Sequence, residues 1–305
     1  MISYIGKRIA FSLFALIGVT AITFFAVFAS GDPAVMLLPP EAQSAEEIAK
    51  FREMMGLDRP LPVQFVEFLG RAARGDFGRS LKYNVPASTL IAERLPSTMV
   101  LAASAVLVSA LIGIPLGVLA AVKRGSIIDD IVILTSTLGL AAPSFWIGTM
   151  LIVVFAVQLR LVPPSGGGSL DKLILPTITL ASGFIAVLAR FTRSGMLDVL
   201  SKEYVMTAHA KGLHERAVLF NHALRNTMIP IVTLLGLEMG TLLGGAVVTE
   251  NVFAWPGIGQ LVVMSIFNRD YPLVVACVLT AAALFILVNL LVDILYVCIN
   301  PTVRL

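Results

Sequence analysis

The chain has 305 residues, of which 57% are hydrophobic and only 13% are charged, and its mean hydropathy is +0.92. A soluble domain could not bury so much apolar surface, so the composition predicts an integral membrane protein and excludes a soluble one. The two cysteines, Cys277 and Cys298, both lie in the last apolar segment, which gives no basis for a disulfide framework or a metal site.

The N-terminal segment predicts a transmembrane helix within residues 1–29. Lys7 and Arg8 precede an apolar run from about Ile9 to Ala29. Such a run resembles the core of a signal peptide, but about 21 apolar residues are too many for a cleavable core and enough to span a bilayer. We therefore expect a retained first span that is entered from the cytoplasm.

Residues 30–97 form the only large polar region, and we expect them to make an external, periplasmic region that contains helices. Ser44 and Glu47 have the spacing of a capping box, and Gly56 is placed to end the helix that follows. A second helix is predicted from about residue 62 to residue 74, ending at Gly75. Acidic and basic residues nearly cancel here, which argues against a nucleic-acid or anionic-lipid surface. The region is either a small exposed cap or a cap that also contacts a partner.

Five further apolar segments predict spans at about residues 98–122, 131–157, 173–189, 228–248 and 273–299. The predicted fold class is therefore an all-α membrane protein with six transmembrane helices, whose core comprises residues 98–305. Pro115, Pro143, Pro176 and Pro230 are expected to interrupt these helices, as is tolerated where neighbouring helices or a water-filled cavity satisfy the backbone.

Basic residues are distributed unequally between the two sides of this arrangement. An even number of spans places both termini on one side, and the short loops of the other side hold only Arg160, Lys172 and Arg269. By the positive-inside rule, both termini and the loop of residues 191–227 face the cytoplasm. The basic residues of the cytoplasmic side are Lys7, Arg8, Lys123, Arg124, Arg193, Lys202, Lys211, Arg216, Arg225 and Arg304.

The predicted fifth span carries a carboxylate and a row of glycines. Glu238 lies near its middle, where an ionised carboxylate is costly unless it faces water or a partner. It could line a translocation pathway, make a polar contact between helices, or be protonated. Gly236, Gly240 and Gly244 follow a four-residue repeat, which predicts a small face against which another helix packs closely.

The stretch from Glu203 to Pro230 lies between two apolar segments but is itself charged, so it must be a structured loop. We expect two short helices that meet at Gly212, a residue type that favours the left-handed conformation at a helix end. Ser201 is predicted to cap the first helix, and the second is predicted from about His214 to Asn226. One interpretation is an amphipathic surface hairpin. The other is a surface covered by a partner protein or the membrane interface, because much of this short segment is apolar. Its apolar residues are Tyr204, Val205, Ala208, Leu213, Val218, Leu219, Phe220 and Leu224.

This stretch resembles the cytoplasmic coupling motif of the permease subunits of ABC importers, with Thr207, Ala208, Gly212 and Leu224 at the motif positions. It is most similar to permeases of the peptide and nickel group. Met206 and His209 replace two arginines that are common there, and Arg225 stands where the general motif has proline. The residues to which the resemblance assigns coupling to an ATPase are Glu203, Thr207, Ala208, Gly212, Leu213, His222, Leu224 and Arg225.

Other segments resemble the same group along the whole chain. They are GDP at Gly31, LGLDRPLPVQF around Asp58, GDFGRSL from Gly75, FAWPGIG from Phe253 and NRDYP from Asn268. The first three resemble the N-terminal region of one of the two permeases that such importers combine. The chain is thus similar to the first permease of a dipeptide, oligopeptide, glutathione or nickel importer.

The sequence contains no phosphate-binding loop, since Gly166 to Gly168 is followed by Ser169-Leu170-Asp171 without the required lysine. We therefore expect a transport subunit and not an enzyme, with no cofactor or metal of its own. The resemblance implies a bacterial inner-membrane protein that works with a second homologous permease, two ATPases that bind ATP and Mg²⁺, and an external substrate-binding protein. We expect the protein to contact membrane lipid and not to bind nucleic acid. The alternatives are a nickel permease of the same group, and an ATP-independent channel or secondary transporter.

Overall fold

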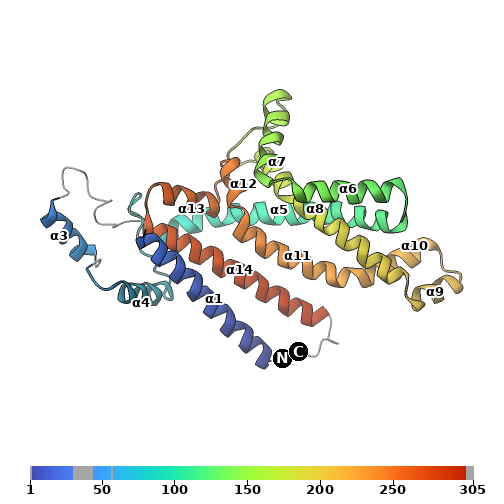
Figure 1. The fold of residues 1–305 in the computed structure, drawn as a ribbon, viewed down its shortest axis with the longest axis horizontal. Coiled ribbons are helices and arrows are strands. Elements are labelled where there is room, and N and C mark those ends of the chain that lie inside the picture. The colour runs from blue at the N-terminus through green and yellow to red at the C-terminus, as the bar shows by residue number, and fades with distance from the viewer. Residues whose placement is uncertain (1, 30–43, 56–57, 300–305) are drawn as a thin grey trace. The chain divides into compact units, whose positions relative to one another are not determined.

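The computed structural model describes residues 2–29, 44–55 and 58–299. These residues are predominantly helical, and the one β contact among them is an isolated bridge between Arg79 and Pro86. They fall into two compact units, Met1–Pro96 with Pro256–Ile286, and Ser97–Trp255 with Leu287–Leu305. Figure 1 shows the helices along the chain. They are α1 (Ile2–Ala29), α3 (Ala45–Met55), α4 (Leu61–Ala72), α5 (Ala87–Val122), α6 (Ile127–Ala141), α7 (Ser144–Leu151), η2 (Ile152–Gln158), α8 (Leu170–Leu200), α9 (Glu203–Ala210), α10 (Glu215–Ala217), η3 (Val218–Leu224), α11 (Arg225–Gly245), α12 (Val247–Val252), α13 (Ile258–Phe267) and α14 (Tyr271–Ile299).

Within the described residues, four helices are long and apolar enough to cross a membrane. They are Arg8–Ala29 of α1, α5, α8 and Tyr271–Ile294 of α14. The α6 and α7–η2 helices make a fifth span if the pair, which is bent by 101°, counts as one. The predicted fifth span is helical as α11, but it is not among these helices, and it carries Arg225 and Glu238. The predicted all-helical membrane fold is confirmed.

Three of the four prolines expected to interrupt helices do not do so. Pro143 lies at the break between α6 and α7. Pro115, Pro176 and Pro230 instead lie inside the continuous helices α5, α8 and α11. The expectation is wrong for these three because a proline removes only one hydrogen bond, and the long helical segments on either side of it keep theirs.

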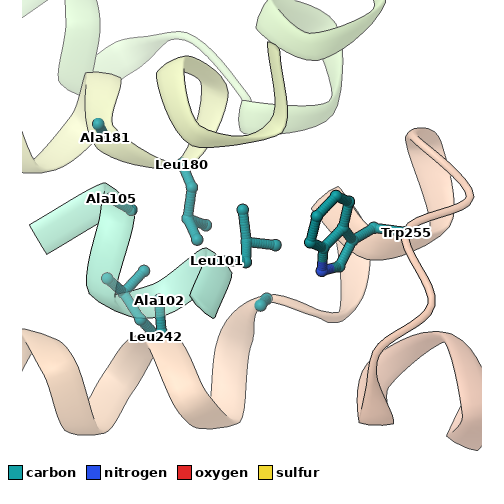
Figure 2. Close-up of a cluster of buried hydrophobic side chains, with 8 residues drawn as sticks. Leu101, Ala102, Ala105, Leu180, Ala181, Leu242 and Trp255 are labelled. Carbon is teal, nitrogen blue, oxygen red and sulfur yellow. The ribbon is translucent and has the colours of Figure 1, made fainter. Parts of the chain in front are cut away.

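The second unit has a core in which α5, α8 and α11 meet, as Figure 2 shows. Leu101 of α5, Leu180 of α8 and Leu242 of α11 are buried there together with Trp255. The indole N–H of Trp255 donates a hydrogen bond of 2.9 Å to the carbonyl oxygen of Ser97. The Trp255 ring can therefore be buried without leaving its polar atom unpaired.

Two glycines one turn apart let α5 approach α8 closely. A Cβ atom on Gly113 would lie 2.8 Å from Leu188 Cβ, and one on Gly117 would lie 2.5 Å from the backbone oxygen of Ala189. Both distances are shorter than a van der Waals contact, so only glycine fits without displacing the helices. These glycines therefore serve packing, although they flank a proline that suggested a helix break.

We predict that Gly117→Ala destabilises the protein by about 1–3 kcal/mol, because the added methyl group has a rigid backbone atom in its way. The matched control is Gly139→Ala in α6, where the new Cβ would lie 3.6 Å from Ala186 Cβ, an ordinary contact. Heat denaturation of the detergent-solubilised protein measures the stability of both variants. Equal melting curves for the two variants would contradict the close packing of α5 and α8.

The first unit contains the N-terminal helix and most of the predicted external region. Half of the predicted capping box is present, since the backbone N–H of Glu47 donates to Ser44 Oγ at 3.3 Å. The Glu47 carboxylate accepts at 2.8 Å from the Ser44 hydroxyl group instead of from the backbone N–H of Ser44. After α4 the chain turns at Gly75, where φ is +80°. Gly56 and the GDP segment at Gly31 lie outside the described residues.

The segment after Gly75 is fixed by one buried carboxylate, that of Asp270. It accepts hydrogen bonds from the hydroxyl group of Ser80 and from the backbone N–H groups of Leu81, at 3.0 Å, and Lys82, at 3.3 Å. The ammonium group of Lys82 donates to the side chain of Asn268 at 2.5 Å. The GDFGRSL and NRDYP segments, far apart in the sequence, are therefore neighbours in the fold.

Candidate functional site

The 203–224 hairpin, which comprises α9, the turn at residues 211–214, α10 and η3, connects α8 to α11 (Figure 1). Its first helix begins at Glu203, whose negative charge near the N-terminus is favourable for the helix dipole. The predicted cap by Ser201 is wrong. Lys202 occupies the cap position, while the hydroxyl group of Ser201 donates at 2.8 Å to the carbonyl oxygen of Asp198. Ser201 therefore stabilises the end of α8.

The turn after α9 has the left-handed glycine that the sequence predicts. Gly212 has a φ of +73° and donates its N–H to the carbonyl oxygen of His209 at 2.9 Å, and Leu213 donates to that of Ala208 at 3.4 Å. These two hydrogen bonds form a Schellman motif, the usual way to satisfy the last carbonyl groups of a helix. A Cβ atom at position 212 would meet nothing within 4 Å. Glycine is needed there for its backbone conformation and not for space.

The second arm of the hairpin is not a separate helix. Residues 214–226 were expected to form one short helix, but α10, η3 and α11 follow one another without a break from Glu215 to Gly245. The middle part, Val218–Leu224, has π-helical hydrogen bonding. The expectation was wrong because the polar residues of this segment suggest a loop, although its backbone continues as a helix into α11. The arm is thus a rigid extension of α11.

The inner face of the hairpin is packed against α8. Val205 and Ala208 of α9 form a buried cluster with Val218. Leu219 and Ala223 pack against Met196 of α8 in a second cluster that also contains Ala121 of α5. The hairpin therefore cannot shift far without disturbing the ends of α5 and α8.

Polar contacts join the two arms at both ends. Near the turn, His209 Nε2 lies 3.6 Å from a carboxylate oxygen of Glu215. Near the base, Asn226 Nδ2 donates across the arms to the hydroxyl oxygen of Tyr204 at 3.2 Å, and within its own arm to the carbonyl oxygen of His222 at 2.7 Å. These contacts are exposed, so each stabilises the hairpin only slightly, but together they fix the spacing of the arms.

Four large apolar side chains of the hairpin remain exposed. Met206 and Phe220 are 58% and 59% exposed, and Tyr204 and Leu213 are also exposed. We call these four residues the outer patch. Half of the apolar residues predicted to need a partner are instead buried: Val205, Ala208 and Val218 in the core of the hairpin, and Leu219 in the cluster around Met196 of α8. The outer patch remains exposed.

The residues predicted to couple to an ATPase likewise divide into buried and exposed ones. Ala208 is buried in the hairpin and Leu224 packs against the Met196 cluster, so both hold the arms together. His222 is half-buried. The remaining ones are exposed around the outer patch or in the turn, and the hydroxyl group of Thr207 donates to the carbonyl oxygen of Glu203 at 2.9 Å. These exposed residues are Glu203, Thr207, Gly212, Leu213 and Arg225.

Two glycines of α11 lie against α14. A Cβ on Gly236 would lie 2.2 Å from Val292 Cγ2, and one on Gly240 would lie 3.1 Å from Asn289 Oδ1. The side-chain surroundings of Gly244 are not among those that the structure describes.

Glu238 lies on a different side of α11 and is half-buried. The hydroxyl group of Thr241, one turn along the same helix, donates to its backbone oxygen at 2.8 Å and contacts Oε2 at 3.2 Å. Among the described residues, Glu238 has no hydrogen bond to another helix, and no three His, Cys, Asp or Glu side chains are grouped to hold a metal ion.

The sequence reasoning missed the best-formed ion pair of the described residues. Arg193 of α8 donates to Asp129 of α6 with Nε at 2.5 Å and Nη2 at 2.7 Å, and the N–H of Gly125 donates to the same carboxylate at 3.0 Å. Asp129 is in the first turn of α6, where acidic residues are common, and Arg193 counted only as a cytoplasmic positive charge. An arginine close to the end of a long apolar run was the signal that could have indicated a partner.

A buried acid was also missed. Glu250 of α12 is 0% exposed, and it accepts a hydrogen bond of 2.7 Å from the hydroxyl group of Thr98 in α5. The backbone oxygen of Glu250 accepts a hydrogen bond of 2.8 Å from the N–H of Trp255. These contacts fix the segment that follows α11.

Comparison with known proteins places this architecture in a family. The family model described as "Binding-protein-dependent transport system inner membrane component" matches residues 113–305, and the model of the corresponding N-terminal region matches residues 1–102. The chain is 42% identical to the glutathione transport system permease protein GsiC of Salmonella choleraesuis, with 100% of this chain and 99% of that protein covered. It is 41% identical to the oligopeptide transport system permease protein AppB of Bacillus subtilis, with 100% of both covered.

Among solved structures, the inward-facing MetNI methionine ABC transporter has a similar fold, with a TM-score of 0.59 at 18% sequence identity. The similarity covers 69% of this chain and 96% of the other chain. The two family models together with full-length identity above 40% establish the relationship. The chain therefore belongs to the family of binding-protein-dependent transport system inner membrane components, and it is a multi-pass permease subunit of an ABC importer.

Proposed function

We propose that this permease forms half of the translocation pathway of an ATP-driven peptide importer and that its 203–224 hairpin receives the movement of a partner ATPase. The second half is a homologous permease, and the complex also contains two ATPases that bind ATP and Mg²⁺ and an external binding protein. Peptides or glutathione-like compounds are favoured as cargo because the full-length relatives are glutathione and oligopeptide permeases.

The observation that carries this proposal is the continuity of the hairpin with α11. A push on the outer patch would act on a packed pair of arms, and the second arm runs as one helix into α11. The hairpin is also packed on the end of α8 through Met196. Movement of the hairpin would therefore displace both helices, without an intervening flexible segment.

The proposed topology has six spans with both termini in the cytoplasm. It counts α1, α5, the bent pair α6–α7–η2, α8, α11 and α14. The positive-inside rule supports this orientation, because the hairpin carries exposed Lys202, Lys211, Arg216 and Arg225 at its base, turn and arms. In this topology the hairpin is on the side where ATP is available.

The remaining assignments concern α11. We propose that Gly236, Gly240 and Gly244 form its packing face and that Glu238 lines the pathway. Support for the packing face is the absence of room for a Cβ at Gly236, which lies against Val292. Support for the pathway role is that Glu238 makes its described hydrogen bonds within its own helix.

We expect that affinity purification of the gently solubilised protein recovers an ABC ATPase and a second permease, identified by mass spectrometry. Phe220→Asp should reduce the recovered ATPase at least about 10-fold, because truncation of a buried aromatic anchor commonly costs 2 kcal/mol or more. Phe267→Asp is the control, since Phe267 is also strongly exposed but belongs to α13, outside the hairpin.

Recovery of the protein alone, as a stable homo-oligomer without ATPase, would contradict the proposal and favour a self-sufficient channel or secondary transporter. Equal loss of the ATPase in the Phe220 and Phe267 variants would instead remove the hairpin from the docking surface.

A further inference from the structure

The sides of α11 differ sharply in what covers them. Gly236 and Gly240 face α14, and Leu242 belongs to the core shared with α5 and α8. On the remaining side, Leu237 is 45% exposed and Thr241 is also exposed, with Glu238 between them in sequence and half-buried. One side of α11 is thus open and contains a carboxylate and a hydroxyl group.

The Glu238 carboxylate is only partly satisfied. Thr241 Oγ lies 3.2 Å from Oε2, and among the described residues no lysine or arginine forms an ion pair with this carboxylate. An acidic group in a transmembrane helix does not face lipid, because removing its charge from water is costly. We therefore expect the open side of α11 to face water or a positively charged group.

We propose that Glu238 and Thr241 form a binding site for the ammonium group of a peptide cargo within the pathway. This inference rests on the proposed function as a peptide importer. An ammonium group has three donors and no acceptor, and a carboxylate beside a hydroxyl oxygen supplies complementary acceptors.

The chemistry of the site selects an ammonium group over the other cations that the family transports. One carboxylate and one hydroxyl group are too few ligands for a transition metal, which requires several nitrogen, sulfur or oxygen ligands. The described residues provide no further His, Cys, Asp or Glu near enough to complete such a set. The terminal ammonium group is also common to peptides of every sequence, so a site for it permits broad cargo selection.

The first test uses a reporter cysteine and needs no knowledge of the cargo. The two native cysteines are first removed by Cys277→Ala and Cys298→Ala, and Leu237→Cys is introduced as the reporter. In the assembled importer, the rate of labelling of this cysteine is measured with two methanethiosulfonate reagents, one bearing a trimethylammonium group and one bearing a sulfonate group. We expect the cationic reagent to be favoured, and Glu238→Gln to lower the ratio of the two rates at least about 5-fold, because a fixed charge concentrates ions of opposite sign. Leu170→Cys at the start of α8, where the side chain is strongly exposed, is the control reporter, whose ratio should not depend on Glu238.

Two outcomes of this labelling would overturn the inference. If Leu237→Cys is labelled by neither reagent in any transport state, the open side of α11 does not face water. If it is labelled but the ratio is the same with glutamate and glutamine at position 238, the site does not attract cations.

The second test measures uptake of trialanine and glutathione by the complete importer. We expect Glu238→Gln to reduce uptake about 10-fold or more, since charge-assisted hydrogen bonds are about twice as strong as neutral ones. Glu238→Asp, which keeps the charge, should retain most uptake. ATPase recovery in the purification should be unchanged in both variants.

The two proposals fail in distinguishable ways. Normal uptake by Glu238→Gln, with all partners present, would overturn only the ammonium site. A wild-type importer that lacks its ATPase partners, or takes up neither trialanine nor glutathione, would overturn the proposed peptide-import function itself.

Discussion

Replacement of Gly212 by valine is expected to abolish uptake while leaving the protein in the membrane. The left-handed conformation costs an ordinary residue roughly 1–2 kcal/mol, and a β-branched residue tolerates it worst. Gly212 adopts this conformation at the turn of the 203–224 hairpin, with a φ of +73°. A cost of 1–2 kcal/mol shifts a local equilibrium by a factor of about 5 to 30. The strain at Gly212 acts directly on the two hydrogen bonds of the Schellman motif, and the His209–Glu215 contact beside them is exposed and weak, so the turn should open at this cost.

The surroundings of Gly212 separate backbone strain from steric exclusion. Nothing lies within 4 Å of a Cβ at this position, so valine would not collide with a neighbour. Gly212→Asn adds a side chain as well, but asparagine tolerates the left-handed region, and this variant should keep most of its uptake. Gly75→Val is the positional control, because Gly75 has a φ of +80° and equally open surroundings outside the hairpin.

The measurement is uptake of labelled peptide by cells with the protein level in the membrane determined in parallel. Normal uptake by Gly212→Val at normal protein level would remove the hairpin from the coupling mechanism. Equal loss with valine and asparagine would show that the side chain itself blocks docking, and that backbone strain is not the cause.

Local signals predicted much of the fold correctly. Gly212 is left-handed, Ser44 accepts from the Glu47 N–H as a helix cap, and the long apolar segments are helices, because each of these features depends on residues close together in the sequence. The Ser201 cap failed although it is also local. The Ser201 hydroxyl group donates to the last turn of α8 instead, and α9 begins one residue later, after Lys202, without a side-chain cap.

Features that depend on tertiary contacts were not predictable from one sequence. The helix runs without a break from Glu215 into α11, but the polar residues among residues 215–226 suggest a loop. The proline at position 230 also suggested a break that the helix does not have. Asp129 and Arg193 are 64 residues apart in the sequence, and no local pattern pairs them. The pairing follows from the packing of α6 against α8, which places the two side chains at one level.

That ion pair gives the second large expected effect. Asp129 is 3% exposed and Arg193 is 23% exposed, so Asp129→Ala leaves a largely desolvated guanidinium group without its carboxylate. Breaking a buried pair from one side typically costs about 3–5 kcal/mol, and the partial exposure of Arg193 favours the lower end, about 3 kcal/mol. Asp130→Ala is the matched control, because Asp130 is the adjacent acid and is exposed, and it should change stability by less than about 0.5 kcal/mol.

A double-mutant cycle isolates the pair from other effects of truncation. Asp129→Ala combined with Arg193→Ala should be less destabilised than the sum of the single variants, because no charge remains unpaired. Arg193→Lys should retain little of the stability that the pair contributes, since lysine keeps the charge but cannot contact both carboxylate oxygens with two fixed N–H groups. Thermal unfolding of the purified importer measures all four variants.

The location of the pair relates this stability effect to transport. Arg193 precedes Met196, against which the hairpin packs, by one turn of α8. Asp129 lies in the first turn of α6, the helix that leads to the bend at Pro143. The pair therefore joins the end of α8 that carries the hairpin to α6, and single variants should lose uptake even at temperatures where they remain folded. Additive stability losses, or normal uptake in Asp129→Ala, would show that α6 and α8 are held together by their apolar contacts alone.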